Sequence, residues 1–300
     1  MKSLILICIV ISSSAFYAQQ DPQFTQYFDN ALFVNPAYAG STGRLTATSI
    51  HREQWVGFDG RPSSTTLSLH TPLSYESVAL GITAVRDVIG PINQTMVYGD
   101  FSYTLKLTQK SRLAFGLKAG LNILSSKTDA LQTTQGNDPN LVQNIQNRIN
   151  PNVGFGLYYH TPHFFVGAST PKLIEQSIDG SKTNVEKRHY FAIAGGVFNI
   201  HRDWKIRPTG QLKMTVNAPM SIDMSLTGIY RDQVFFGSMY RLNAALGVFA
   251  QYQITKQFRL GIATDFSTTA IRKYNYGTYE VLLSYDFVYN RKGIRSPRYF

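Results

Sequence analysis

Histidine is the residue type in this chain best suited to metal binding or acid–base chemistry, and six histidines are scattered along it. They are His51, His70, His160, His163, His189 and His201. His160 and His163 have the spacing of metal ligands, but Pro162 places them in a turn, and neither a cysteine nor a nearby carboxylate completes a zinc site. The pair therefore predicts a turn with two solvated histidines.

Other catalytic signatures are absent from the sequence. It contains no phosphate loop, dinucleotide fingerprint, Gly-x-Ser-x-Gly elbow or calcium loop. A membrane-face Ser/His hydrolase stays open as a third functional hypothesis, because such triads carry no local sequence signature. We expect a non-enzymatic protein with no metal and no cofactor.

Charged residues that alternate with apolar ones are the second set with chemical potential. The basic members are Arg112, Lys118, Lys205, Arg207, Lys213 and Arg259, and the acidic members are Asp100, Asp223, Asp265, Glu280 and Asp286. If all of them face one interior, they form either a basic channel for anions or a lumen closed by ion pairs, and we favour the ion pairs. Because the charge is dispersed along an exported chain, we expect no nucleic acid partner.

The elements that position these side chains must be strands, because apolar and polar residues alternate along most of the chain. In residues 112–124, Phe115, Leu117 and Leu121 fall on one face, whereas Lys118 and Asn122 fall on the other. The same alternation recurs in residues 204–216, 220–230 and 279–289. Long amphipathic strands separated by turn residues are typical of outer-membrane barrels.

The alternation predicts fourteen strands. They lie near residues 44–52, 63–71, 77–87, 95–107, 111–124, 151–160, 163–170, 188–199, 203–215, 219–230, 232–241, 243–255, 257–266 and 277–290. Every long connection (53–62, 125–150, 171–187 and 267–276) follows an odd-numbered strand, as in a barrel with short periplasmic turns and long outer loops. The predicted fold class is therefore all-β, a transmembrane antiparallel up-and-down β-barrel over residues 44–290.

Two of the long connections carry helix-start signals. Asp138-Pro139, followed by Leu141, Val142, Ile145 and Ile149, predicts a short amphipathic helix. Thr170-Pro171, followed by Leu173, Ile174 and Ile178, predicts a second one.

Composition agrees with a barrel. The 300 residues include 19 Phe, 18 Tyr and 2 Trp, whereas charged residues make up only 16%. This composition excludes a disordered tail and a coiled coil. A mean hydropathy of -0.14 without a long apolar run excludes a polytopic helical membrane protein.

The first 18 residues predict a secretory signal peptide. A basic start is followed by an apolar run from Leu4 to Ile11 and by small residues before Ala18, after which we expect cleavage. Cys8, the only cysteine, lies inside that apolar run. We therefore expect the mature protein in the cell outer membrane, in contact with its lipid.

Four short motifs flank or interrupt the predicted barrel. They are Asp21-Pro22-Gln23-Phe24-Thr25-Gln26-Tyr27, Asn35-Pro36-Ala37-Tyr38-Ala39-Gly40, Arg52-Glu53-Gln54-Trp55-Val56-Gly57-Phe58-Asp59-Gly60-Arg61-Pro62 and Ser296-Pro297-Arg298-Tyr299-Phe300. In order and spacing they resemble the PorP/SprF family of the type IX secretion system.

The resemblance implies an outer-membrane accessory or anchor protein. Its implied partners are other type IX secretion components and a large secreted surface adhesin of the gliding-motility type, which binds through its C-terminal domain. The candidate partner or structural residues are Asp21, Pro22, Phe24, Tyr27, Asn35, Pro36, Tyr38, Gly40, Arg52, Gln54, Trp55, Pro62, Pro297, Tyr299 and Phe300. The alternative function is a transport barrel for small or hydrophobic solutes.

Physical roles are predicted for three parts of these motifs. Residues 19–43 carry enough aromatic surface to pack as a plug or cap at the periplasmic mouth. Trp55 is placed to anchor at the membrane interface and to stack with Arg52 or Arg61. The basic tail, residues 291–300, either docks an acidic partner or extends into solvent.

Overall fold

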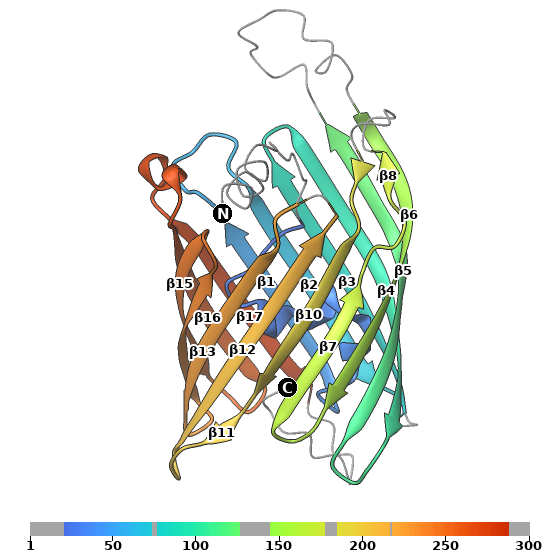
Figure 1. The fold of residues 1–300 in the computed structure, drawn as a ribbon, viewed down its shortest axis with the longest axis vertical. Coiled ribbons are helices and arrows are strands. Elements are labelled where there is room, and N and C mark those ends of the chain that lie inside the picture. The colour runs from blue at the N-terminus through green and yellow to red at the C-terminus, as the bar shows by residue number, and fades with distance from the viewer. Residues whose placement is uncertain (1–20, 74–76, 127–144, 178–184, 217, 288–300) are drawn as a thin grey trace, which may run out of the picture.

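The computed structural model describes residues 21–73, 77–126, 145–177, 185–216 and 218–287, and these residues form a closed antiparallel barrel (Figure 1). The fourteen barrel strands are β1 (Leu45–Glu53), β2 (Ser63–Pro72), β3 (Val78–Ile89), β4 (Ile92–Lys106), β5 (Arg112–Ser126), β6 (Ile145–His160), β7 (Phe164–Thr170), β10 (His189–Gly196), β12 (Trp204–Thr215), β13 (Ser221–Tyr230), β14 (Val234–Arg241), β15 (Ala245–Gln253), β16 (Phe258–Ser267) and β17 (Thr278–Phe287). Each strand pairs with its sequence neighbours, and pairing of β1 with β17 closes the circle. The predicted fold class is confirmed.

One end of the barrel carries the long connections that the structure describes. We call it the long-loop end, defined by residues 54–62, 171–177, 185–188 and 268–277. The opposite end, the short-turn end, carries the connections 107–111, 161–163, 231–233 and 254–257, together with the short strand β11 (Phe198–Asn199). The predicted parity of the loops is therefore confirmed within the described residues.

Alternation along the strands separates two unlike faces. Leu117 is 57% exposed on the outside of β5, whereas its neighbour Lys118 is 2% exposed on the inside. Leu226 and Ile262 are likewise more than half exposed on the outer face. Apolar side chains therefore cover the outside of the barrel, and polar ones fill its interior, as the sequence predicts.

Both predicted loop helices need correction where the structure describes them. Asp138-Pro139 lies outside the described residues, but Ile145 and Ile149 belong to β6, where Ile149 pairs with Ile123 of β5. After Thr170 the chain forms no helix over residues 171–177. Instead β8 (Gln176–Ser177) pairs with β9 (Val185–Glu186).

Contacts with β6 explain the missing helix after Thr170. The backbone N–H of Leu173 donates to the carbonyl oxygen of Val153, and the side chain of Asn152 bonds both the N–H and the carbonyl of Ile174. These bonds hold residues 173 and 174 against β6, and they engage the carbonyl oxygen of Ile174, which in a helix would accept the N–H four residues further along the chain.

The first residues that the structure describes lie inside the barrel (Figure 1). We call residues 21–43 the lumenal segment; it contains η1 (Tyr27–Asn30), α2 (Ala31–Val34) and η2 (Pro36–Tyr38). A further short helix, η4 (Ala270–Tyr274), lies in a long loop. No helix in the described residues has the length and apolar character needed to cross a membrane.

The lumenal segment extends deeper than the mouth at which the sequence placed it. It folds back on itself, so that the rings of Phe24 and Phe33 pack edge to face with centroids 6.1 Å apart. Tyr27, Phe28 and Leu32 are buried in a second apolar cluster, separate from that of Phe24 and Phe33. A barrel of this size leaves interior space that its own side chains do not fill, and the segment supplies the missing apolar volume.

Candidate functional site

Among the described residues, several buried charged side chains gather where the lumenal segment contacts the barrel wall. Four groups of contacts hold the segment, from the long-loop end to the short-turn end. They involve Asp21, the backbone of Thr25 and Gln26, Asp29, and the turn at Asn35-Pro36.

The first group lies near the long-loop end. Nζ of Lys172 donates to Asp21 at 2.7 Å and to Glu186 at 2.6 Å, and Nδ1 of His189 lies 3.5 Å from Asp21. Burial opposes the charge of Asp21, but the neighbouring Lys172, His189 and Lys213 hold the pKa of this carboxyl well below its usual range. Asp21 and Glu186 in turn raise the pKa of Lys172 above its usual value, against the effect of burial.

We expect Lys172→Met to release the connection between β7 and β10. The substitution leaves two largely buried carboxylates without their shared cation, so hydrogen exchange in residues 171–177 should accelerate by about tenfold or more. Exchange measured peptide by peptide on protein in lipid checks this. Unchanged protection would contradict the role of Lys172.

This first group should hold across the neutral pH range. A lowered Asp21 pKa gives stabilisation that is present above about pH 4 and is lost as pH falls through the folded-state value. A raised Lys172 pKa gives stabilisation that is lost only above about pH 10. Protection of residues 171–177, corrected for intrinsic exchange, should therefore fall once the pH drops below about 4.

The second group surrounds Arg52, which β1 directs into the lumen. Its two terminal nitrogens donate to Glu280 at 2.5 Å and to Asp265 at 2.9 Å, and all three side chains are at most 3% exposed. Glu280 also accepts the backbone N–H groups of Thr25 at 2.6 Å and Gln26 at 3.1 Å. This group therefore binds the lumenal segment to both strands that close the barrel, β1 and β17.

Arg52 therefore does not stack on Trp55 as the sequence suggested. The strand period turns Arg52 inward, where the carboxylates of β16 and β17 compensate its charge. Trp55 follows the end of β1 with a positive φ of 57°, and its N–H donates to the hydroxyl of Thr278 at 3.3 Å.

The third group lies toward the short-turn end and below the middle of the barrel. Asp29 accepts from Arg259 at 3.0 Å and from Gln251 at 2.7 Å. On the opposite wall, Lys118 pairs with Asp100 at 3.0 Å and donates to the carbonyl oxygen of Leu32. The predicted lumen closed by ion pairs is therefore correct, with the addition that the lumenal segment provides some of the partners.

The turn at Asn35-Pro36 lies directly against the barrel wall. Asn35 caps it by accepting the N–H of Ala37 at 3.0 Å, and its amide donates to the carbonyl oxygen of Leu157 at 2.9 Å. Glycines make room for this contact: a Cβ on Gly116 would overlap the backbone of Pro36 and Ala37, and one on Gly156 would overlap the Asn35 side chain.

We expect Gly116→Ala to destabilise the folded protein by about 1–3 kcal/mol, because backbone cannot give way as a flexible side chain does. The matched control is Gly99→Ala, also in a barrel strand, where the added Cβ would meet nothing closer than 3.9 Å. Urea unfolding in lipid vesicles measures both variants. Equal midpoints for the two would contradict the close contact.

Tyr38 and Gly40 hold the C-terminal end of the lumenal segment in place. The ring of Tyr38 packs between His70 and Tyr158 at centroid distances of 5.5 and 5.6 Å, and burial raises its pKa to about 12. Gly40 adopts a φ of 76°, which favours glycine, and its N–H donates to Nδ1 of His70 at 3.1 Å. The chain then turns to enter β1.

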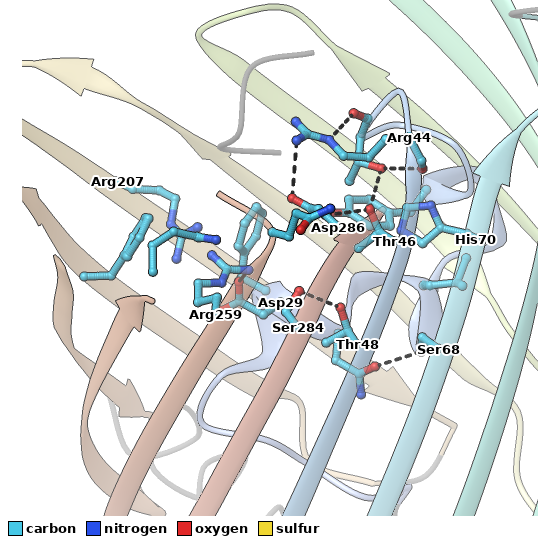
Figure 2. A pocket seen from close by; sticks show the side chains of 18 of the residues that line it. Asp29, Arg44, Thr46, Thr48, Ser68, His70, Arg207, Arg259, Ser284 and Asp286 are labelled. Atoms are coloured by element: carbon cyan, nitrogen blue, oxygen red, sulfur yellow. Dashed lines mark hydrogen bonds and ion pairs between the residues drawn. The ribbon is translucent and has the colours of Figure 1, made fainter. Parts of the chain in front are cut away.

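A small cavity of about 60 Å³ lies between this part of the segment and the wall at the short-turn end (Figure 2). Polar groups line much of it, among them Arg44, Arg207, Arg259, Asp29, Asp286 and His70. Arg44 pairs with Asp286 at 3.4 Å. The volume suffices for a few water molecules.

The remaining candidate residues divide between the lumen and one loop. Pro22, Phe24 and Tyr27 are in the lumen, where the Tyr27 hydroxyl bonds Thr209 at 2.7 Å. Gln54 and Pro62 close the first long loop through a backbone hydrogen bond of 2.9 Å. Pro297, Tyr299 and Phe300 lie outside the described residues, as do the predicted signal peptide and the basic tail.

The histidines are dispersed in the structure as well. His160 ends β6 with its ring against Tyr158, and His163 is exposed in the following turn. Among the described residues, no group of three His, Cys, Asp or Glu side chains is placed to hold a metal ion.

Sequence reasoning missed Asp29, Lys172, Glu186 and His189 as members of the site. None belongs to a recognisable motif, and each meets its partner only through the closed barrel. One usable signal was present: glycines at inward positions 116 and 156 mark the place where another part of the backbone approaches.

Comparison with the solved structure of a transporter supports the barrel fold. The toluene transporter TbuX of Ralstonia pickettii has 12% identity and a TM-score of 0.50, with 86% of this chain and 92% of that chain covered. Acinetobacter baumannii Omp33 has 11% identity and a TM-score of 0.47, with 81% and 98% covered. A Pseudomonas aeruginosa FadL homologue has 13% identity and a TM-score of 0.47, with 87% and 94% covered. No curated protein matches the sequence.

A family assignment comes from the sequence itself. Residues 16–285 match the family described as "Type IX secretion system membrane protein PorP/SprF". The match includes the three N-terminal motifs and every strand of the barrel except the last two residues of β17. This chain therefore belongs to the PorP/SprF family of type IX secretion system membrane proteins.

Proposed function

We propose that this protein is a non-enzymatic outer-membrane accessory of the type IX secretion system that assists export or surface attachment of a partner adhesin. The observation that carries the proposal is the filled lumen of a barrel from a secretion family. Residues 21–43 occupy the interior, held by buried ion pairs, so the protein acts through its surfaces rather than as an open pore.

Orientation follows from the distribution of the loops. Short turns face the periplasm in outer-membrane barrels, so the long-loop end faces the outside of the cell. The proposed signal peptide, residues 1–18, delivers the chain to the periplasm, from which it inserts. The secreted partner then meets the long-loop end.

A surface suited to this partner is formed by two of the long loops. The N–H of Val56 donates to the carbonyl of Gly277, and the N–H of Tyr276 donates back to the carbonyl of Val56. Phe58, Tyr274 and Tyr276 remain 45%, 70% and 78% exposed. Exposed aromatic side chains held on a paired backbone are typical of protein interaction surfaces.

Deletion of the gene and complementation test the proposal. Without the protein, the partner adhesin should disappear from the cell surface, and the wild-type gene should restore it. A Tyr274→Ser, Tyr276→Ser double variant should restore it poorly, whereas Tyr252→Ser, an exposed tyrosine on the barrel wall, should restore it fully. If every surface adhesin remains secreted and attached in the deletion strain, the proposed function is wrong.

The alternative, a transport barrel for small or hydrophobic solutes, has less support. The similar structures include a toluene transporter, but at 12% identity this likeness concerns the fold. In the described residues the cavity beneath the lumenal segment measures only about 60 Å³. Solute uptake or steady conductance by the intact protein would favour the alternative.

A further inference from the structure

Arg207 is a buried cation without a hydrogen-bond partner for its Nε. It projects from β12 into the small cavity at the short-turn end and is 2% exposed (Figure 2). In the part of the chain that the structure describes, no carboxylate forms an ion pair with it. The charge of a buried arginine is normally compensated by an anion. The residues that line the cavity around Arg207 therefore indicate which kind of anion would bind there.

The other charges of the cavity are already compensated. Asp29 is held by Arg259 and Gln251, Asp286 by Arg44 and Thr46, and Asp232 by Lys205. Arg207 is therefore the one lining arginine, among the described residues, that forms no ion pair with a carboxylate. Its guanidinium lies 4.3 Å from the ring centroid of Phe28, which covers one face and orients the donor edge.

We propose that this cavity binds a single carboxylate group through Arg207. A carboxylate matches the planar fork of the guanidinium and carries one negative charge. A dianion would meet Asp29 and Asp286 at close range, and a larger ligand would exceed about 60 Å³. Thr48 and Ser284 line the wall opposite Arg207 (Figure 2), and because their hydroxyls share one hydrogen bond of 3.3 Å, one of the two hydroxyl protons is left to donate to the carboxylate.

The position of the cavity suggests the source of the carboxylate. The proposed function places the short-turn end in the periplasm. On that basis, an Asp or Glu side chain of a periplasmic protein segment reaches the cavity through the short-turn end. Asp29 and Tyr38 of the lumenal segment line the same space, so the bound carboxylate contacts the segment as well as the wall.

Binding to the purified full-length protein in detergent tests the site without reference to orientation. The probe is a fluorescent peptide with a run of glutamates, measured by anisotropy, with sodium acetate as competitor. We expect Arg207→Gln to weaken peptide binding by about tenfold or more, since a hydrogen-bonded charge is removed. Arg112→Gln, which removes the same charge at the same end of the barrel outside the cavity, should change it less than twofold.

Two controls accompany this measurement. Arg207→Lys retains the positive charge but loses the paired N–H donors of the guanidinium, so binding should weaken by a smaller factor than in Arg207→Gln. Heat-modified migration on gels shows that each variant is folded. Acetate that displaces the peptide only at high concentration indicates a peptide source, whereas equal affinity per carboxylate indicates a free anion. Equal loss in the Arg207 and Arg112 variants, or no binding to wild type, overturns the site and leaves the adhesin proposal untouched.

Discussion

Replacing Arg52 by leucine should destabilise the protein by about 3–5 kcal/mol, the largest loss that we expect from one substitution. The change leaves Asp265 and Glu280 without a cation in a region where their side chains are at most 3% exposed. It also removes the hydrogen bond from Arg52 to the hydroxyl of Thr25. Both the closure of the barrel and the docking of the lumenal segment therefore weaken together.

Urea unfolding in lipid vesicles measures this loss of stability, and two further variants serve as controls. Arg61→Leu breaks an ion pair with Glu53 at 2.8 Å, but Arg61 is 47% exposed, so the cost should stay below about 1 kcal/mol. Adding Glu280→Gln to Arg52→Leu should recover part of the stability, because an uncompensated charge is then removed. Equal costs for the Arg52 and Arg61 variants would show that the buried cluster does not hold the segment.

Deleting residues 21–39 should convert a closed barrel into a conducting one. The deletion removes the aromatic core around Phe24, Phe28 and Phe33 and leaves a lumen lined by Lys118, Arg241 and Arg259. In planar bilayers we expect discrete, salt-dependent conductance steps from the shortened protein and none from the intact protein. The arginines and lysines that lose Asp21 and Asp29 should make these steps anion-selective.

A peptide of residues 21–39 added to the shortened protein provides the control for this prediction. If the channel is open because the segment is missing, the peptide should reduce the conductance, whereas a peptide of the same composition in scrambled order should not. A shortened protein that folds and inserts but does not conduct would mean that other residues close the lumen.

The strands of this fold are predictable from the sequence because their information is local. Outward apolar residues alternate with inward polar or small residues, and turn residues separate the strands, so β5 and β12 need no distant contact to be recognised. The helix predicted after Thr170 was wrong for the complementary reason. Residues 171–177 are shaped by backbone bonds to β6, and a capping pattern carries no information about such contacts.

The candidate site was predictable in its motifs but not in its contacts. The Asn35-Pro36 and Arg52 motifs mark places where the lumenal segment and the barrel wall meet: Asn35-Pro36 lies in the segment and contacts the wall, and Arg52 lies in the wall and contacts the segment. Their partners are far away in sequence: Arg52 meets Glu280 across 228 positions, and Lys172 meets Asp21 across 151. Only closure of the barrel brings these charges together. Strand alternation therefore predicts that a charged side chain faces the lumen, but it does not predict which residue the side chain pairs with.

The central claim is that residues 21–43 lie inside the barrel, and a cysteine cross-link in intact cells tests it most directly. A Cβ on Gly247 would lie 2.7 Å from Cγ2 of Thr25, so Thr25→Cys and Gly247→Cys should form a disulfide. Mass spectrometry should find the linked peptides in most molecules, and none when Gly99→Cys on the outer face replaces Gly247→Cys. Reduced thiols at 25 and 247 in the folded, inserted protein would contradict the account.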